Sequence, residues 1–177
     1  MIITSYSLFI NEKNETKEEK IYEYGCAMLY FNVKNWEEIT SFIDKEDIGE
    51  DGLEDEPHLT LLFGLHKDEV SIDDVKKAFE GYTSIDIELE SVDLFENDKF
   101  DVVKFKVKKT KELLDINEKL SILPHTTDFP DYNPHITIAY VKKGKGKKYV
   151  VDNYNATLSS KKVMYSADEK TMFKLEE

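Results

Sequence analysis

A short pattern occurs twice in this chain: a proline, a histidine, one apolar residue and a threonine, followed by further apolar residues. The copies are residues 57–63, PHLTLLF, and residues 134–140, PHITIAY, and 77 positions (135 − 58) separate their histidines. β-branched and other apolar residues favour strands, and alternate side chains of a strand share a face. The side chains predicted to share a polar face are His58 and Thr60 in the first copy and His135, Thr137 and Ala139 in the second.

The same order of elements leads up to both copies of the pattern. Apolar periodicity predicts strand 24–33, helix 35–43 and strand 57–65 in the first half, and strand 100–107, helix 110–122 and strand 134–141 in the second. A repeat of this length is too long for a solenoid and is typical of two lobes. We predict an α+β fold in which two pseudo-symmetric β-α-β lobes with antiparallel sheets flank a central cleft. A pseudo-two-fold axis would bring the motif strands face to face across that cleft.

Turn and capping signals assign the remaining segments. Ser71 predicts the start of a helix over 71–80, with Asp74 as its capping-box partner. The acidic segment 44–56 is predicted to be a solvated, mobile loop. Further predictions are strands at 84–95 and 149–151, a Lys/Gly-rich loop at 142–148, and a hairpin with arms at 161–166 and 170–175. The whole is one domain, 1–177, with lobe 1 at about 22–80, lobe 2 at about 84–141 and a C-terminal hairpin within 149–177.

Composition and charge restrict the partners of the chain. Its 177 residues carry a formal net charge of −13, and 40% of them are hydrophobic. A negative surface repels a long nucleic acid but tolerates a small phosphate-bearing ligand in a locally positive pocket. The first residues lack a signal-peptide pattern, and no apolar run reaches membrane-spanning length. Since Cys26 is the single cysteine, no internal disulfide forms, and we expect a cytoplasmic protein with no membrane partner.

The repeated polar residues suit acid–base chemistry at phosphorus. An imidazole titrates at about pH 6.5, so one histidine can accept a proton while the other donates one. Threonine hydroxyls one strand step away can donate hydrogen bonds to phosphate oxygens. The sequence contains no HExxH, no HxH and no cysteine cluster, so we expect neither a metal nor another cofactor. Cys26 lies in an apolar strand and is expected in the core, which argues against nucleophilic catalysis.

Two His-x-Thr motifs, one in each β-α-β half, resemble those of the two-histidine (2H) phosphoesterase superfamily, which includes RNA ligase-like 2′,3′-cyclic phosphodiesterases. This resemblance covers about residues 22–141. The segments PHLTLLFGL and LPHTTDFPDYNPHITIAYVKKG are most similar to one branch, the bacteriophage anti-CBASS enzymes. That branch destroys the cyclic di- and trinucleotide signals of bacterial immunity. The branch-level resemblance rests mainly on residues 121–144.

The resemblance implies a role for each motif residue. His58 and His135 are expected to be the acid–base pair, and Thr60 and Thr137 to donate hydrogen bonds to the phosphate. In a 3′–5′-linked ring, one histidine would deprotonate the ribose 2′-OH and the other would protonate the departing 5′-oxygen. A 2′,3′-cyclic phosphate would form, and water would open it with the roles reversed. The sequence leaves open which histidine plays which role.

Nucleobases bind by stacking, and the chain offers several aromatic side chains for this purpose. The base-binding candidates are Tyr24, Tyr132, Tyr165 and Phe173. Tyr24 is the first choice, because related enzymes place an aromatic residue near this strand start. Lys142 and the loop that follows it are expected to attract phosphate. His125 is a further candidate for substrate contact, whereas His66 is expected at the surface.

Three functions are compatible with these patterns. The first is a metal-independent phosphodiesterase acting on cyclic di- or trinucleotides, encoded by a phage and working in the host cell cytoplasm. The second keeps the chemistry but acts on RNA ends that carry a 2′,3′-cyclic phosphate. The third is a sponge that binds a cyclic nucleotide without cleaving it. Intact histidines and threonines in both motifs favour the enzymes, because a sponge needs no acid–base pair.

Overall fold

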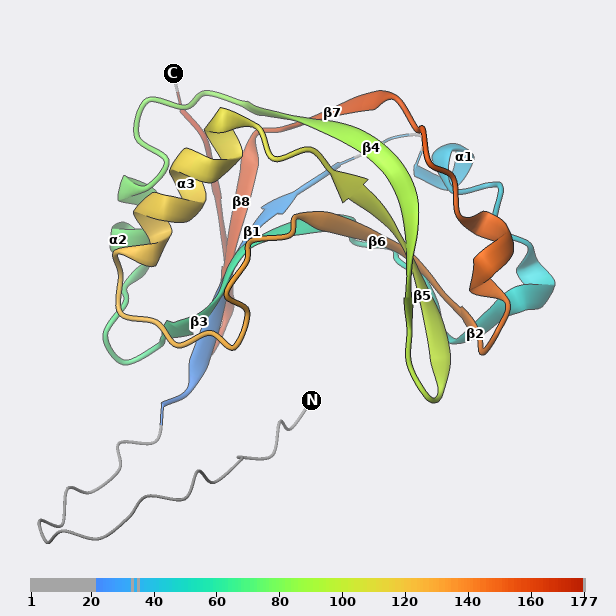
Figure 1. Ribbon diagram of the computed structural model, residues 1–177. Coiled ribbons are helices and arrows are strands. Elements are labelled where there is room, and N and C mark those ends of the chain that lie inside the picture. Colours follow the sequence, from blue (N-terminus) through green and yellow to red (C-terminus); the bar gives the residue numbers. More distant parts are fainter. Residues whose placement is uncertain (1–21, 33, 35, 177) are drawn as a thin grey trace, which may run out of the picture.

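The computed structural model describes residues 22–32, 34 and 36–176 (Figure 1). The strands are β1 Tyr24–Tyr30, β2 Ile48–Leu53, β3 His58–His66, β4 Ile85–Glu96, β5 Phe100–Val107, β6 His135–Lys142, β7 Ala156–Ser160, β8 Lys162–Ser166 and β9 Lys170–Lys174. The helices are α1 Trp36–Ile39, α2 Ile72–Lys77 and α3 Lys111–Ser121, with 3-10 helices η1 Lys45–Asp47 and η2 Gly146–Tyr149. The first residues, where we noted the lack of a signal-peptide pattern, lie outside this range. None of the helices described is long and apolar enough to cross a membrane.

The described strands form a single antiparallel sheet in the order β7-β4-β5-β6-β3-β1-β8-β9, and β2 pairs with β6. The predicted α+β class with antiparallel strands is therefore confirmed. One residue, Lys161, joins β7 to β8, although β4, β5, β6, β3 and β1 lie between them in the sheet. The sheet must curl to bring β7 next to β8 along the chain in this way, and it forms the arch seen in Figure 1.

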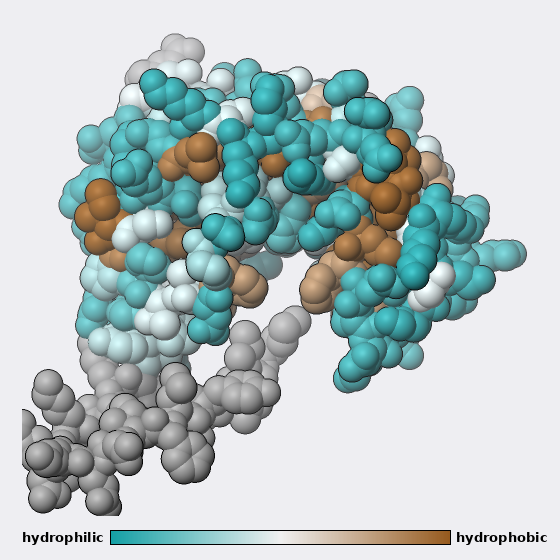
Figure 2. Space-filling view, in the orientation of Figure 1, coloured by the Kyte–Doolittle hydropathy of each residue, from teal (hydrophilic) through white to brown (hydrophobic). Residues whose placement is uncertain are grey.

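The helices lie on the outer side of the arch. Helices α2 and α3 flank one limb and α1 flanks the other (Figure 1). The sheet face toward the helices, the covered face, carries the core. Its fully buried side chains include Leu29, Leu59, Leu61, Phe105 and Ile136, and they belong to the same hydrophobic core as Leu113, Ile116 and Leu120 of α3. The other sheet face, which carries both His-x-Thr motifs, lines the hollow beneath the arch (Figure 2). We call it the open face.

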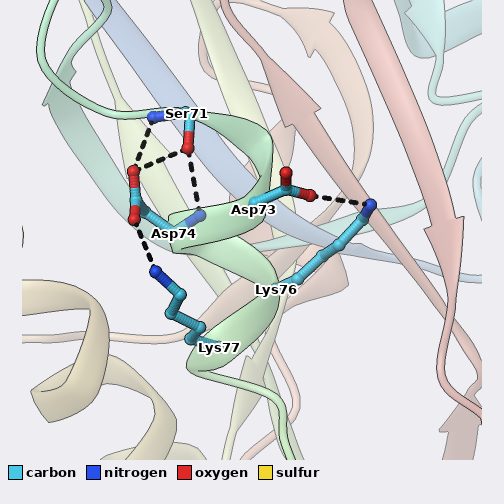
Figure 3. A network of polar contacts seen from close by, with 5 residues as sticks. All are labelled: Ser71, Asp73, Asp74, Lys76 and Lys77. Carbon is cyan, nitrogen blue, oxygen red and sulfur yellow. Dashed lines mark hydrogen bonds and ion pairs between the residues drawn. The ribbon is translucent and has the colours of Figure 1, made fainter.

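Capping residues fix two of the helices as predicted. Ser71 Oγ accepts a hydrogen bond from Asp74 N (3.2 Å), and Asp74 Oδ2 accepts one from Ser71 N (3.1 Å), which completes the capping box of α2 (Figure 3). Ion pairs one turn apart, including Lys77–Asp74 at 3.0 Å, extend this network. Thr110 caps α3 in the same manner, because its hydroxyl accepts from Leu113 N.

Helix α1 is shorter than the predicted 35–43. Both the backbone N and the hydroxyl of Thr40 donate to the Trp36 carbonyl, and Ile43 N donates to Thr40 O in an i→i−3 bond. The chain after Ile39 therefore continues as turns, as expected where β-branched residues and a threonine hydroxyl compete with the helical pattern.

The prediction of a loop over residues 44–56 is wrong. β2 forms there and pairs with β6 through Ile48–Val141 and Leu53–Ala139. β6 touches β3 only near its start, so the rest of that edge needs another hydrogen-bonding partner. Two predictions near the C-terminus also change: 149–151 is reduced to the end of η2 and one Val92–Val151 bridge, and β7 was not foreseen. The hairpin is present as β8 and β9.

Helices are exchanged between the two sequence halves. Trp36 of α1, from the first half, packs edge-on against Phe105 of β5 in the second, with ring centroids 6.0 Å apart. Asn117 of α3, from the second half, donates from Nδ2 to the Leu61 carbonyl of β3 in the first (2.7 Å). The spatial limbs of the arch therefore do not coincide with the contiguous stretches 22–80 and 84–141.

Candidate active site

The two motif strands are neighbours at the centre of the sheet. β3 and β6 pair antiparallel at Leu59 and Ile136. In an antiparallel pair the flanking residues lie opposite each other, so His58 lies opposite Thr137, and Thr60 opposite His135. The prediction that the motif strands face each other across the cleft is thus modified: they lie side by side, and all four polar side chains share the open face.

Equivalent hydrogen bonds orient the two imidazoles. His58 Nδ1 lies 2.9 Å from the Glu56 carbonyl oxygen, and His135 Nδ1 lies 3.0 Å from that of Asn133, in each case two residues upstream. A carbonyl oxygen only accepts hydrogen bonds, so Nδ1 carries the proton in both rings. Nε2 is therefore the atom left for chemistry in each ring: a base when the ring is neutral and an acid when it is protonated.

A β-bulge follows each motif at the same place. In β3, Thr60 and Leu62 pair with consecutive residues of β1, so Leu61 between them has no partner in the register. In β6, Thr137 and Ala139 pair with consecutive residues of β5, so Ile138 has none. An extra residue reverses the alternation of side chains beyond it. The open face of β3 is therefore His58, Thr60 and Phe63, and that of β6 is His135, Thr137 and Tyr140.

This bulge corrects the predicted facing of β6. Ala139 was expected beside His135 and Thr137, but it is fully buried on the covered face. Tyr140 is half-buried instead, and the Thr137 hydroxyl is within hydrogen-bonding range of its phenol. The bulge therefore places an aromatic side chain, rather than a methyl group, beside the motif.

Both bulged residues have their carbonyls satisfied from elsewhere in the chain. Asn117 Nδ2 donates to Leu61 O (2.7 Å), and Glu54 N donates to Ile138 O (2.9 Å). An unpaired buried carbonyl would be costly, so these donors stabilise the two bulges and, through them, the positions of the motif side chains.

β5 brings a cation next to the second motif. Lys104 pairs with Thr137 and Lys106 with His135, and on the other side Lys104 pairs with Asp93 of β4. The pKa of His135 is lowered, chiefly by desolvation of its ring and further by the charges of Lys104 and His58; the Asn133 carbonyl and Asp93 oppose the shift. Neutral imidazole is consequently favoured at His135.

Cys26 also lies on the open face, half-buried, rather than in the core as predicted. Burial raises the pKa of its thiol to about 11, and a hydrogen bond with Thr60 only partly offsets this. The thiol is therefore protonated at neutral pH and is a poor nucleophile. Within the described residues, no group of three or more histidine, cysteine or carboxylate side chains is arranged to hold a metal ion.

Comparison with known proteins identifies the family. The sequence profile of the 2′-5′ RNA ligase superfamily matches residues 32–166, a stretch that contains both motifs. The chain belongs to this superfamily. Its members are 2H phosphoesterases, so the resemblance seen in the sequence is confirmed at this level. No curated protein matches the chain in sequence.

Solved structures of 2H phosphoesterases share the fold. Usb1 of Kluyveromyces marxianus superposes with a TM-score of 0.61 at 8% identity, covering 88% of this chain and 99% of that one. E. coli LigT complexed with 3′-AMP gives 0.52 at 13% identity, covering 88% and 97%. TT0787 of Thermus thermophilus gives 0.53 at 15%, covering 85% and 95%. At these identities the likeness concerns the architecture.

In this 2H phosphoesterase, two of the predicted substrate-binding residues lie on the open face. Tyr24 opens β1 and is 41% exposed, and its ring centroid lies 6.2 Å from those of Phe63 and His66. Lys142 ends β6 and is exposed, and its Nζ donates to the Glu46 carbonyl (2.7 Å). Both side chains are accessible to a ligand in the hollow.

Three other aromatic predictions do not fit the hollow. Tyr165 is corrected: it is 4% exposed on the covered face, where its hydroxyl donates to the Val70 carbonyl (3.1 Å). Phe173 packs edge-on against Phe79, on the covered side. The Tyr132 ring packs on the core, and its buried hydroxyl has no hydrogen-bond partner among the described residues. Burial raises the pKa of that hydroxyl.

The remaining two histidines lie where the end of β3 meets the segment before the second motif. His66 was expected at the surface but is 7% exposed; its Nε2 bonds Thr126 Oγ1 (2.8 Å), and its ring stacks on Tyr22 at 3.7 Å. His125 Nδ1 lies 2.9 Å from the Leu123 carbonyl, and its backbone bridges to Leu65. Together they fasten the segment before the second motif to the end of β3.

The residues missed in the sequence are Phe63, Phe100, Lys104 and Tyr140. An aromatic residue five positions after each motif histidine was visible, but reading it as part of the open face required knowledge of the bulge. Lys104 follows from the sequence: in the predicted strand 100–107, the alternation Val103-Lys104-Phe105-Lys106-Val107 places both lysines on one polar face.

Proposed function

We propose that this 2H phosphoesterase hydrolyses 3′–5′ linkages of cyclic di- and trinucleotide second messengers, with His58 and His135 as its acid–base pair. The observation that supports this most directly is the matched orientation of the two imidazoles. Each donates Nδ1–H to a carbonyl two residues upstream and has Nε2 free on the open face. One pair of groups thereby supplies both proton transfers of an in-line displacement at phosphorus, with no metal needed for either.

The lowered pKa of His135 favours this residue as the base of the first step. Neutral His135 accepts the proton of the ribose 2′-OH, and the 2′-oxygen forms a bond to phosphorus. The bond from phosphorus to the 5′-oxygen breaks, and protonated His58 delivers its proton to that oxygen. The products are a 2′,3′-cyclic phosphate and a free 5′-hydroxyl. In the second step the roles reverse, and water opens the cyclic phosphate.

The groups around the histidines stabilise the charge that develops on phosphate. Thr60 and Thr137 lie diagonally across the same square of side chains and donate hydrogen bonds to the non-bridging oxygens. Lys104, adjacent to Thr137, adds a positive charge on the same face. Tyr24 offers an exposed ring for stacking on a base, and Lys142 offers a cation at the far end of β6.

The proposals of a cyclic substrate and of a role against bacterial immunity rest on the sequence of residues 121–144, which resembles that of the bacteriophage anti-CBASS enzymes. A phage enzyme of this kind would act in the host cytoplasm and remove the nucleotide signal of bacterial immunity. A compact ligand also suits a protein of net charge −13, because only a few phosphates need to be neutralised.

The second candidate is hydrolysis of 2′,3′-cyclic phosphates at RNA ends. It is favoured by the architecture shared with E. coli LigT, which has been solved with 3′-AMP, a nucleoside with a single 3′-phosphate. The same four motif residues would perform it, because opening of a 2′,3′-cyclic phosphate is the second step of the proposed mechanism.

One experiment separates these functions. The protein is mixed, in excess EDTA, with 3′,3′-cyclic GMP–AMP, cyclic triadenylate and an RNA ending in a 2′,3′-cyclic phosphate, and products are resolved by chromatography and mass. We expect cleavage of at least one ring, lost in His135→Ala. Cleavage of the RNA end alone would move the protein to the second candidate. Rings that bind but remain intact would make it a sponge and overturn the proposal.

A further inference from the structure

An aromatic pair stands at each end of the row of catalytic side chains. In the first half, Tyr24 of β1 lies beside Phe63 of β3, with centroids 6.2 Å apart. In the second, Phe100 of β5 lies beside Tyr140 of β6, edge-on at 5.6 Å. The strand registers show that the two pairs occupy equivalent positions. Phe63 lies opposite Cys26, and Tyr24 is two residues before Cys26. Tyr140 lies opposite Val102, and Phe100 is two residues before Val102.

The second pair is placed on the open face by the bulge at Ile138. Without it, Tyr140 would point toward the core with Ile136. Phe100 and Tyr140 are both half-buried, and Phe95 of β4, opposite Val102 in the same row, is 56% exposed. The hollow of Figure 2 accordingly has hydrophobic side chains on both of its sides.

The spacing of both pairs from the catalytic centre suits a nucleoside. Phe63 follows Thr60 by three residues, and Tyr140 follows Thr137 by three, which is roughly 7–10 Å along a strand that carries a bulge. Since β3 and β6 run antiparallel, the two pairs extend in opposite directions from the four motif residues. A phosphate held at the centre therefore has an aromatic surface within the reach of one nucleoside on each side.

Polar groups near the second pair add a means of recognising a base. Burial raises the pKa of Tyr140, and the negative charges of Glu54 and Asp51 raise it further, so these two carboxylates contribute a negative potential at the phenol. Carboxylate oxygens only accept hydrogen bonds and match the N–H donors on the edge of a base.

We infer that Phe100 and Tyr140 form a second base-binding subsite, so that the substrate carries a nucleobase on both sides of the scissile phosphate. This rests on the proposed function and narrows it: the enzyme takes a dinucleotide unit, closed or linear, rather than a terminal phosphate with one base. Tyr24 with Phe63 and Tyr140 with Phe100 each hold one nucleoside, and the phosphate between them meets His58 and His135.

The test measures binding of ligands that cannot be cleaved, so it does not depend on turnover. The dinucleotide dApdA lacks the 2′-OH nucleophile, and its two halves are the methyl esters of deoxyadenosine 3′-phosphate and 5′-phosphate. Dissociation constants are determined by calorimetry for the wild type, Tyr24→Ala, Tyr140→Ala and Phe100→Leu. Tyr140→Phe keeps the ring, and Phe42→Ala removes an exposed aromatic that packs near Tyr149 on the outer side.

We expect Tyr140→Ala and Phe100→Leu to weaken binding of dApdA roughly 5- to 100-fold, as loss of one stacked base does, and Phe42→Ala to leave it unchanged. Tyr140→Phe should weaken it less than Tyr140→Ala, because the ring that stacks remains. Tyr140→Ala should weaken binding of one of the two methyl esters, and Tyr24→Ala should weaken binding of the other. Wild-type affinity of folded Tyr140→Ala and Phe100→Leu for all three ligands would overturn the inference, as would equal weakening of both methyl esters by Tyr140→Ala. If the wild type cleaves neither rings nor ApA while these binding differences hold, the proposed function fails and the subsite stands.

Discussion

His58, His66 and His135 carry the same imidazole, but their hydrogen bonds give them different tasks. His66 has both ring nitrogens engaged, by Thr126 Oγ1 and by Glu69 Oε2 at 3.2 Å, and a ring stacked on its face. His58 and His135 each have one nitrogen bonded to the backbone, and no bond within the described residues occupies the other. A group that exchanges protons with substrate needs such a free atom.

The first prediction compares these histidines. His58→Ala or His135→Ala should lower kcat about 10²- to 10⁴-fold, the usual contribution of one general acid or base, with little change in stability because the lost bonds are local. His66→Ala should retain the chemistry but lower the free energy of unfolding by about 1–3 kcal/mol, since the hydrogen bonds from the imidazole to Thr126 and Glu69 are lost. Kinetics and urea denaturation measure both quantities. An active His58→Ala or His135→Ala protein would contradict the acid–base assignment.

The second prediction concerns pH. His135 acts as a base, so kcat/KM falls as the pH drops through its pKa, which is lowered from the ordinary value. Lys104 disfavours the protonated ring, so removal of that charge raises the pKa of His135, and the acid limb of the profile for Lys104→Ala moves to higher pH. Lys108→Ala is the control, because Lys108 pairs with Glu88 at 2.7 Å. An unshifted limb in Lys104→Ala would show that the limb does not report His135.

At the scale of single residues, the sequence predicted that the four motif residues lie on one face, but it did not predict which residues lie beside them. A strand has a period of two, so His-x-Thr could be placed on one face from the letters alone. The same rule placed Ala139 beside the motif and Tyr140 in the core, because it assumes a regular ladder. Nothing in the sequence ITIAYV identifies Ile138 as the bulged residue, and the position of the Phe100–Tyr140 pair depends on that bulge.

At the scale of secondary-structure elements, the matched bulges of β3 and β6 determine which side chains lie on the open face. Each is held by a donor from a distant segment: Asn117 of α3 for Leu61, and Glu54 after β2 for Ile138. The acidic composition of 44–56 favoured a loop, but pairing with the unoccupied edge of β6 outweighs that local preference. Such pairing is a tertiary effect, and it is absent from a reading of local pattern. The capped starts of α2 and α3, whose signals are local, were predicted well, although α2 ends at Lys77 rather than at residue 80.

The third prediction tests one bulge through its donor. Asn117→Leu keeps the side-chain size but leaves the Leu61 carbonyl without its partner, which should cost about 1–3 kcal/mol of unfolding free energy. Because Leu61 separates Thr60 from Phe63, kcat/KM should also fall. Glu118→Ala, at an exposed position of the same helix, should stay within about 0.5 kcal/mol of wild type. A stable, fully active Asn117→Leu protein would show that the bulge needs no such support.

For the molecule as a whole, curvature joins the two repeats into one site. The single-residue link between β7 and β8 forces the sheet to bend, and α1 and α3 pack across the halves from which they come. The duplication was visible in the sequence as two motifs with matching elements before them. The exchange of helices was not, because either packing buries the same apolar faces.

The fourth prediction follows from the net charge of −13. A dinucleotide places its scissile phosphate among His58, His135 and Lys104, whereas a 20-nucleotide RNA carries further phosphates onto an acidic exterior. Salt screens that repulsion, because the Debye length is about 10 Å at an ionic strength of 0.1 M and falls as salt is added. The kcat/KM per linkage should therefore be lower for the long RNA than for ApA at 20 mM salt, and the difference should shrink by 300 mM. A basic nucleic-acid enzyme shows the reverse, with affinity falling as salt rises. If the long RNA is cleaved better than ApA at low salt, the exterior attracts nucleic acid despite its net charge, and polymeric RNA becomes the better substrate class.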